Sequence, residues 1–127
     1  MLQDSHWQYR LTWAQTEVRA TIKSLPIQLQ THAARLPVTF EHRPNEGLRL
    51  EGIEPDTLGL FVGSAFAEND SAGPCVPAQI ILFLDNLWDM ADNDVEGFRT
   101  EIRATYLHEL GHYLGLDESD LTARELD

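Results

Sequence analysis

The sequence predicts an α+β fold in which a small sheet of three to four strands packs on two long helices. Apolar residues recur with helical spacing over residues 5–24 and again over residues 95–114. Between these segments, apolar and polar residues alternate in short stretches, which is the two-residue period of half-buried strands. With 127 residues, 43% of them hydrophobic, residues 1–127 are expected to form one domain with a single core.

The first helix is expected over residues 5–24, starting at the capping-box pair Ser5 and Gln8. Trp13 lies off the apolar stripe of this helix and is expected to pack against a loop or another element. A proline is tolerated in the first turn of a helix, so a short second helix is expected over residues 26–34. The stripe itself consists of Trp7, Leu11, Ala14, Val18, Ile22 and Leu25.

Three strands are expected over residues 38–41, 58–62 and 79–84, with a weaker extended piece over residues 48–53. The third strand is apolar on both faces, as expected where helices cover the sheet. If it lies at the edge of the sheet, its backbone can hold an extended peptide. The segment before it, residues 64–77, is too long for a tight turn and is a candidate binding loop.

The second long helix is expected over residues 95–114, and it carries the residues that indicate chemistry. His108 and His112 stand four residues apart, with Glu109 beside the first. Positions i and i+4 share one face of a helix, so both imidazoles can reach a single cation. This spacing is typical of two zinc ligands and a general base in metallopeptidases. The last two turns are apolar nearly all round and are expected to be buried.

Three carboxylates follow this helix and supply a possible third oxygen ligand. They are Asp117, Glu118 and Asp120. Gly115 precedes them and permits the left-handed conformation that ends a helix and turns the chain back. Carboxylates here are equally expected as caps of a short helix over residues 119–126. The spacing alone therefore leaves the third ligand open.

The charge distribution excludes some classes of partner. The formal net charge is −12, and residues 85–127 hold twelve acids against three bases. Nucleic acid is not expected, because phosphate binding depends on clusters of Lys and Arg. The longest apolar run, residues 80–84, is too short to cross a membrane. A single cysteine, Cys75, and the lack of an apolar run in the first ten residues favour a cytoplasmic protein.

Several segments from Leu25 onward occur in an order shared with one protein family. They are Leu25-Pro26, residues 38–41 with Arg43-Pro44, residues 58–63, residues 80–84 and residues 108–116. In these segments the chain resembles the small bacterial zincin-like metallopeptidases. The resemblance implies a minimal zincin-like fold, bound Zn²⁺, His108 and His112 as zinc ligands, and Glu109 as the catalytic base.

The chain departs from the family pattern at the third ligand. The family commonly has Asp at this position, where the present sequence has Glu118. The glutamate keeps a carboxylate but lengthens the side chain, so Asp117 and Asp120 remain alternatives to Glu118. The resemblance thus implies Glu118 as the third metal ligand and keeps its two neighbours as candidates.

These features predict hydrolysis of a peptide or protein substrate, with endopeptidase activity expected. Zinc would lower the pKa of its bound water to about 7, and Glu109 would take the proton and pass it to the leaving amine. Tyr106 and Tyr113 project away from the ligand face of the helix, so neither is expected to donate a hydrogen bond to the oxyanion. Residues 64–77 are the candidate source of such a donor. The alternative is a zinc-binding module with weak or no turnover that binds a protein partner through its acidic surface.

Overall fold

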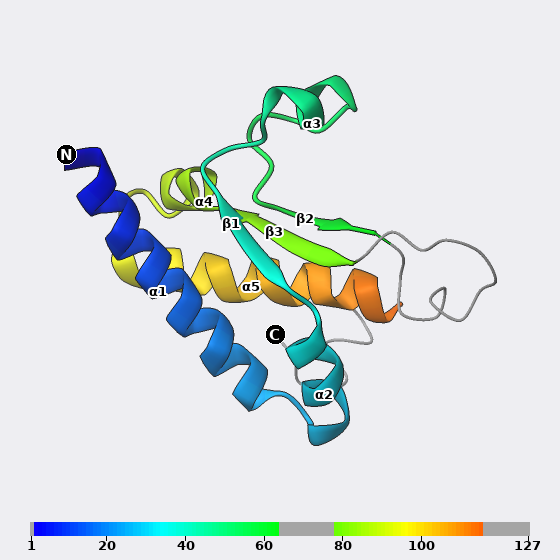
Figure 1. Cartoon of the computed structure of the whole chain (residues 1–127). Coiled ribbons are helices and arrows are strands. Elements are labelled where there is room, and N and C mark those ends of the chain that lie inside the picture. The colour runs from blue at the N-terminus through cyan, green and yellow to red at the C-terminus, as the bar shows by residue number, and fades with distance from the viewer. Residues whose placement is uncertain (1, 64–77, 116–127) are drawn as a thin grey trace.

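A three-stranded sheet lies against one long helix, and a second long helix also crosses that helix (Figure 1). The computed structural model describes residues 2–63 and 78–115. This arrangement of helices and a small mixed sheet confirms the predicted α+β class. In chain order the elements are α1 (Leu2–Ser24), α2 (Ile27–Arg35), β1 (Val38–Glu41), α3 (Glu46–Leu50), β2 (Gly59–Val62), β3 (Gln79–Phe83), α4 (Leu84–Met90) and α5 (Val95–Leu114).

The strand order within the described residues is β1-β3-β2, so β3 is the central strand. It pairs in parallel with β1, where Val38 lies opposite Ile80, and antiparallel with β2, where Gly59 lies opposite Leu82. Residues 79–83 therefore do not lie at a sheet edge, and the condition under which this strand could hold a peptide is not met. Both sides of β3 are used for strand pairing, and its apolar character reflects this central position.

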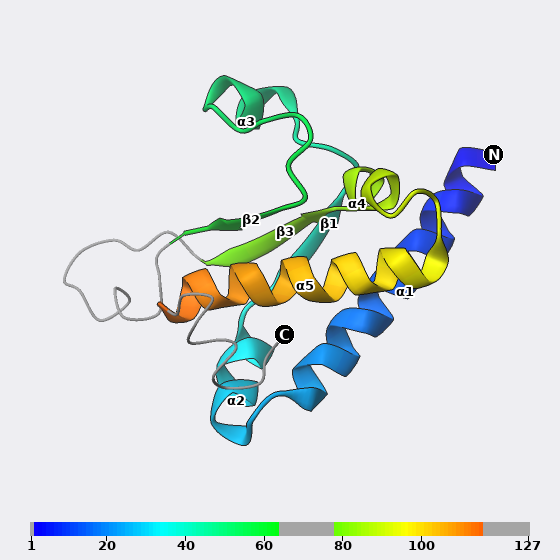
Figure 2. The ribbon, with the colours of Figure 1, turned by 180° about the vertical axis from the view of Figure 1, so that it is seen from behind.

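The main core lies between the sheet and α5, which runs along one face of the sheet in both views (Figures 1 and 2). Ile80 and Leu82 of β3 are fully buried, as are Ile102, Tyr106 and Leu110 of α5. These side chains belong to one apolar cluster, and burial of each Ile or Leu side chain is worth about 1.5–3 kcal/mol. The packing fixes which faces of α5 are turned toward the core.

Helix α1 packs across α5 and confirms the predicted apolar stripe, since Ala14 and Val18 are buried. Trp13 stacks on Trp88 of α4 at 5.9 Å between ring centroids and meets Phe98 of α5 edge-on at 6.3 Å. The expected contact of Trp13 with another element is thus confirmed. The helix begins before the predicted cap, because it spans Leu2–Ser24 and so includes Ser5.

Two short helices differ from the sequence-based expectation. The prediction of a weak extended piece over residues 48–53 is wrong, because Glu46–Leu50 form α3. The side chain of Asn45 accepts a hydrogen bond from the Leu48 N–H at 2.9 Å, which caps this helix. Helix α4 was not predicted. Its buried Leu84 and Leu87 continue the apolar run of β3. The sequence pattern therefore does not show where the two-residue spacing of the strand changes to helical spacing.

The predicted limits of α5, residues 95–114, are confirmed at both ends. Asp94 accepts a hydrogen bond from the Gly97 N–H at 2.7 Å and caps the first turn. Gly115 ends the helix in the left-handed conformation, with φ of 74°. Among the described residues, neither α5 nor any other helix combines the length and apolarity needed to cross a membrane.

Candidate metal centre

The last turns of α5 bring His108, Glu109 and His112 together. One potential ligand atom from each residue lies within 4.8 Å of the others. The two imidazole ring centroids are 4.5 Å apart, and Glu109 Oε1 lies 3.4 Å from His112 Nδ1. The helical spacing seen in the sequence therefore produces one compact group of donors that could hold a metal ion.

The three donors differ in their exposure. His108 and His112 are exposed, whereas Glu109 is only 7% exposed. The prediction that the end of α5 is buried all round is wrong for the face with the histidines, because only the other faces pack on the sheet and α1. The imidazoles are accessible to an ion from solvent, while the surrounding side chains restrict the carboxylate of Glu109.

An open hollow of about 330 Å³ lies beside this group, between α5 and the start of β2. Both His108 and Glu109 face it, so a molecule in the hollow lies next to the donors. The hollow is lined by Leu58, Gly59, Ala104, Thr105, His108 and Glu109. A small molecule can therefore approach the imidazole of His108 and the carboxylate of Glu109 from the side of β2.

The donor set suits zinc, because imidazole nitrogens and carboxylate oxygens are its usual ligands alongside cysteine. A family model described as zincin-like metallopeptidase matches residues 33–127, which is most of the chain. The chain belongs to the zincin-like metallopeptidase family. This confirms the resemblance seen in the sequence, and zinc is the metal that the family implies. No curated protein matches the sequence.

In this zincin-like chain, Gly59 allows β2 to approach α5 very closely. A Cβ atom at this position would lie 2.5 Å from Thr105 Cγ2 and 3.5 Å from Glu109 Cγ. Gly59 therefore sets the distance between the wall of the hollow and the helix that carries the donors. No sequence-based prediction concerned the role of Gly59. The available signal was a glycine inside an alternating strand, which often marks close approach of another element.

Replacing Gly59 with alanine is expected to lower the free energy of unfolding by about 1–3 kcal/mol, the usual cost of overpacking. The added methyl group would overlap Thr105 Cγ2. Thr105→Ser removes that methyl group, so the double variant should recover part of the loss. Urea unfolding of metal-free wild type, both single variants and the double variant measures this coupling. Equal losses in Gly59→Ala with and without Thr105→Ser would contradict the predicted contact.

Neither tyrosine of α5 is placed to act on a substrate in the hollow. Tyr106 is fully buried, and its hydroxyl has no hydrogen-bond partner among the described residues. Burial raises the pKa of Tyr106 well above its usual range, so the hydroxyl stays neutral. Tyr113 is buried and packs against Phe61 of β2 at 5.8 Å between ring centroids. The orientation predicted from the helical wheel is thus confirmed for both residues.

Several residues named in the sequence analysis lie outside the described part of the chain. These include the three candidates for the third ligand, the predicted short helix over residues 119–126, and the candidate loop over residues 64–77 with its cysteine. The described residues supply two imidazoles and one carboxylate. The third ligand therefore stays a prediction from the sequence.

Proposed function

We propose that this chain is a zinc-dependent peptidase in which His108 and His112 bind the metal and Glu109 is the general base. The observation that carries this proposal is the grouping of these three residues within 4.8 Å, beside a hollow, in a member of the zincin-like metallopeptidase family. Glu118 is the proposed third ligand, with Asp117 and Asp120 as the alternatives.

The chemistry divides between the metal and the chain. When bound, zinc supplies a Lewis acid that polarises a carbonyl and lowers the pKa of water to about 7. Glu109 accepts a proton from the attacking water and donates it to the leaving amine nitrogen. Its carboxylate suits this task because it is nearly buried and borders the hollow. The contact of Glu109 Oε1 with His112 Nδ1 at 3.4 Å supports its position beside the ligands.

The proposed substrate is an extended peptide that lies along β2. Leu58 and Gly59, at the start of this strand, line the hollow beside His108 and Glu109. Within the described residues β2 is an edge strand, so its outer backbone groups are directed away from β3. A peptide paired with this edge continues past the site in both directions, which favours cleavage inside a chain and hence endopeptidase activity.

Product mapping tests this function. Zinc-loaded protein incubated with an unstructured protein is expected to release internal fragments, identified by mass spectrometry, and a chelator should suppress them. The second candidate function is a zinc-bound module that binds a protein partner through its acidic surface, and the net charge of −12 is the observation behind it. Absence of fragments at full zinc occupancy, together with retention of an intact protein partner, would favour this second function.

The third ligand is tested by three alanine variants. Glu118→Ala should weaken zinc binding by more than roughly 10–100-fold, which is the typical effect of replacing a residue that only hydrogen-bonds to a metal ligand. Asp117→Ala and Asp120→Ala should remain within about threefold of wild type, because they leave the ligand set intact. Competition with a chromophoric chelator gives the three affinities. Release of zinc by Asp120→Ala alone would contradict the assignment of Glu118.

A further inference from the structure

Asn86 is a buried polar residue in the first turns of α4, directly after β3. Only 5% of its surface is exposed. Its side-chain Nδ2 donates hydrogen bonds to the carbonyl oxygens of Pro55 and Thr57, each at 2.8 Å. Both carbonyls belong to the segment that leads from α3 into β2. One amide group therefore attaches this segment to the first turn of α4, which directly follows the central strand.

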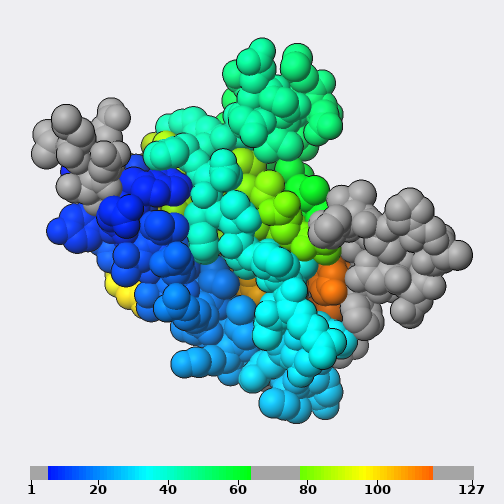
Figure 3. All heavy atoms as spheres, viewed as in Figure 1, coloured from blue at the N-terminus to red at the C-terminus, as the bar shows by residue number. Residues whose placement is uncertain are grey.

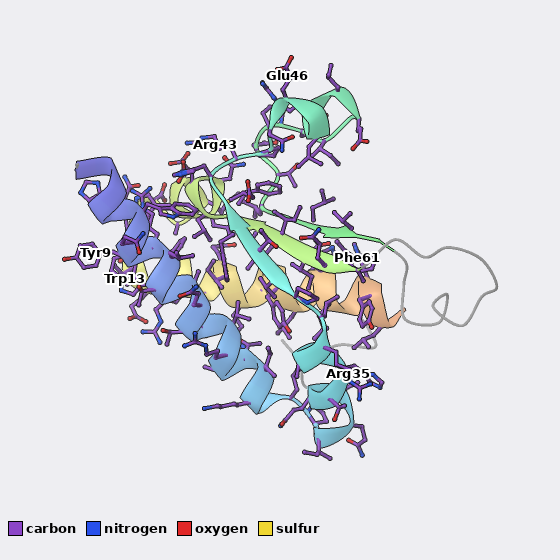
Figure 4. All side chains as sticks on the ribbon, viewed as in Figure 1. Tyr9, Trp13, Arg35, Arg43, Glu46 and Phe61 are labelled. Atoms are coloured by element: carbon purple, nitrogen blue, oxygen red, sulfur yellow. The ribbon has the colours of Figure 1, made fainter. Side chains whose placement is uncertain are left out.

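Arg43 fixes the orientation of the same amide. Its Nη1 donates a hydrogen bond to Asn86 Oδ1, and its Nη2 donates to Asp89 Oδ2 at 3.0 Å. Because a guanidinium can only donate, the oxygen of Asn86 must face Arg43 and the NH₂ group must face the two carbonyls. Arg43 lies just beyond the end of β1 and beside α4 in Figure 4. Asn86 thus connects the two ends of the segment formed by residues 43–57, which runs from the end of β1 to the start of β2.

Within the described part of the chain, α3 in this segment has no extensive contact with any other helix or strand. Figure 3 shows α3 and its neighbours as a separate knob beyond the sheet. The hydrogen bonds of its turns join residues of the same segment, such as the bond from the Thr57 N–H to Glu54 O at 3.2 Å. The two bonds from Asn86 therefore hold the returning chain where it enters β2. Loss of both would leave two carbonyls without their donor.

The returning chain leads directly into the candidate metal centre. After Thr57 come Leu58 and Gly59, which line the hollow. Leu58 O accepts a hydrogen bond from the Phe83 N–H at 2.9 Å, and the Cβ position of Gly59 faces Thr105 and Glu109. A shift of Thr57 would thus move the wall against which a peptide lies. It would leave His108 and His112 in place, because they are carried by α5.

We propose that Asn86 is a positioning residue for peptide binding: it holds Pro55 and Thr57 so that the start of β2 stays aligned with the candidate metal centre. This inference rests on the proposed function, because it assigns the start of β2 to the substrate. Asn86 acts through the backbone of Pro55 and Thr57, just before β2, and does not itself line the hollow. Its loss is expected to weaken peptide binding and to leave zinc binding unchanged.

The test compares Asn86→Asp with wild type. The aspartate keeps the size of the side chain but replaces both donor hydrogens by an oxygen that faces two carbonyls. We expect KM for an unstructured peptide to rise about tenfold, with kcat and zinc affinity within about threefold of wild type. Asn93→Asp is the matched control, because it makes the same change at an exposed position beyond α4 and should alter none of these values. If Asn86→Asp does not fold, Asn86→Ser replaces it, since a hydroxyl retains one donor.

Amide hydrogen exchange separates the outcomes. In Asn86→Asp, exchange should accelerate by about tenfold or more at residues 57–62 and stay at the wild-type rate in α5. Uniform acceleration across the chain, or an equal loss of kcat and zinc affinity, would overturn a positioning role and indicate general destabilisation. Unchanged exchange at residues 57–62 would overturn it as well. If wild type binds zinc but cleaves no peptide, the proposed function fails and the role in peptide binding fails with it, whatever the exchange pattern.

Discussion

Replacing His108 or His112 with alanine is expected to abolish zinc binding, zinc-dependent stability and peptide cleavage together. The two imidazoles supply two of the proposed ligands, and their ring centroids lie 4.5 Å apart at the end of α5. A metal bound only by the folded state stabilises that state by about 2.7 kcal/mol when its free concentration is a hundred times its dissociation constant. Wild type should gain this amount on addition of zinc, and both variants should gain close to nothing. Thermal unfolding with and without zinc measures the difference.

His6→Ala is the control for these variants. His6 is exposed on α1 and belongs to a different hollow from the one beside His108. The control should keep the zinc-dependent gain in stability and the cleavage rate. Retention of wild-type zinc affinity by either His108→Ala or His112→Ala would contradict the assignment of that residue as a ligand.

Replacing Glu109 with glutamine is expected to lower turnover by about a hundredfold or more, while zinc binding and folding persist. Glutamine has nearly the same shape, so the contacts at the wall of the hollow are retained. Its neutral amide cannot accept the proton from the attacking water. Turnover should be compared at equal zinc occupancy, so that any difference reports on the base rather than on the metal.

Glu101→Gln is the matched control, since it makes the same change on α5 two turns before the donors. Its turnover should stay within about twofold of wild type, because Glu101 does not line the hollow. Equal turnover in wild type and Glu109→Gln would reject Glu109 as the base. The zinc-bound module would then be the better account of the chain.

The sequence predicted α5 and its donors because their signals are local. Asp94 and Gly115 cap the helix through contacts within a few residues, and the four-residue spacing of His108 and His112 is fixed by helix geometry alone. Only the exposure of the histidines required the tertiary structure. It depends on which sides of α5 face the sheet and α1.

The features that could not be predicted are set by contacts between distant parts of the chain. The central position of β3 depends on pairing with β1 and β2, and a run of apolar residues does not reveal its partners. The approach of Gly59 to Thr105 and the bonds from Asn86 to Thr57 are likewise long-range contacts. A short helix such as α4 is also hidden where its apolar residues continue those of a strand.

Zinc titration of metal-free protein tests the proposed function most directly. The initial rate of cleavage of an unstructured peptide is measured at each zinc concentration, and bound zinc is measured in the same samples. Zinc-dependent catalysis at His108, Glu109 and His112 predicts no cleavage without metal and a rate that rises in proportion to bound zinc until about one ion is bound per chain. Cleavage that persists without metal, or no cleavage at full occupancy, would contradict it.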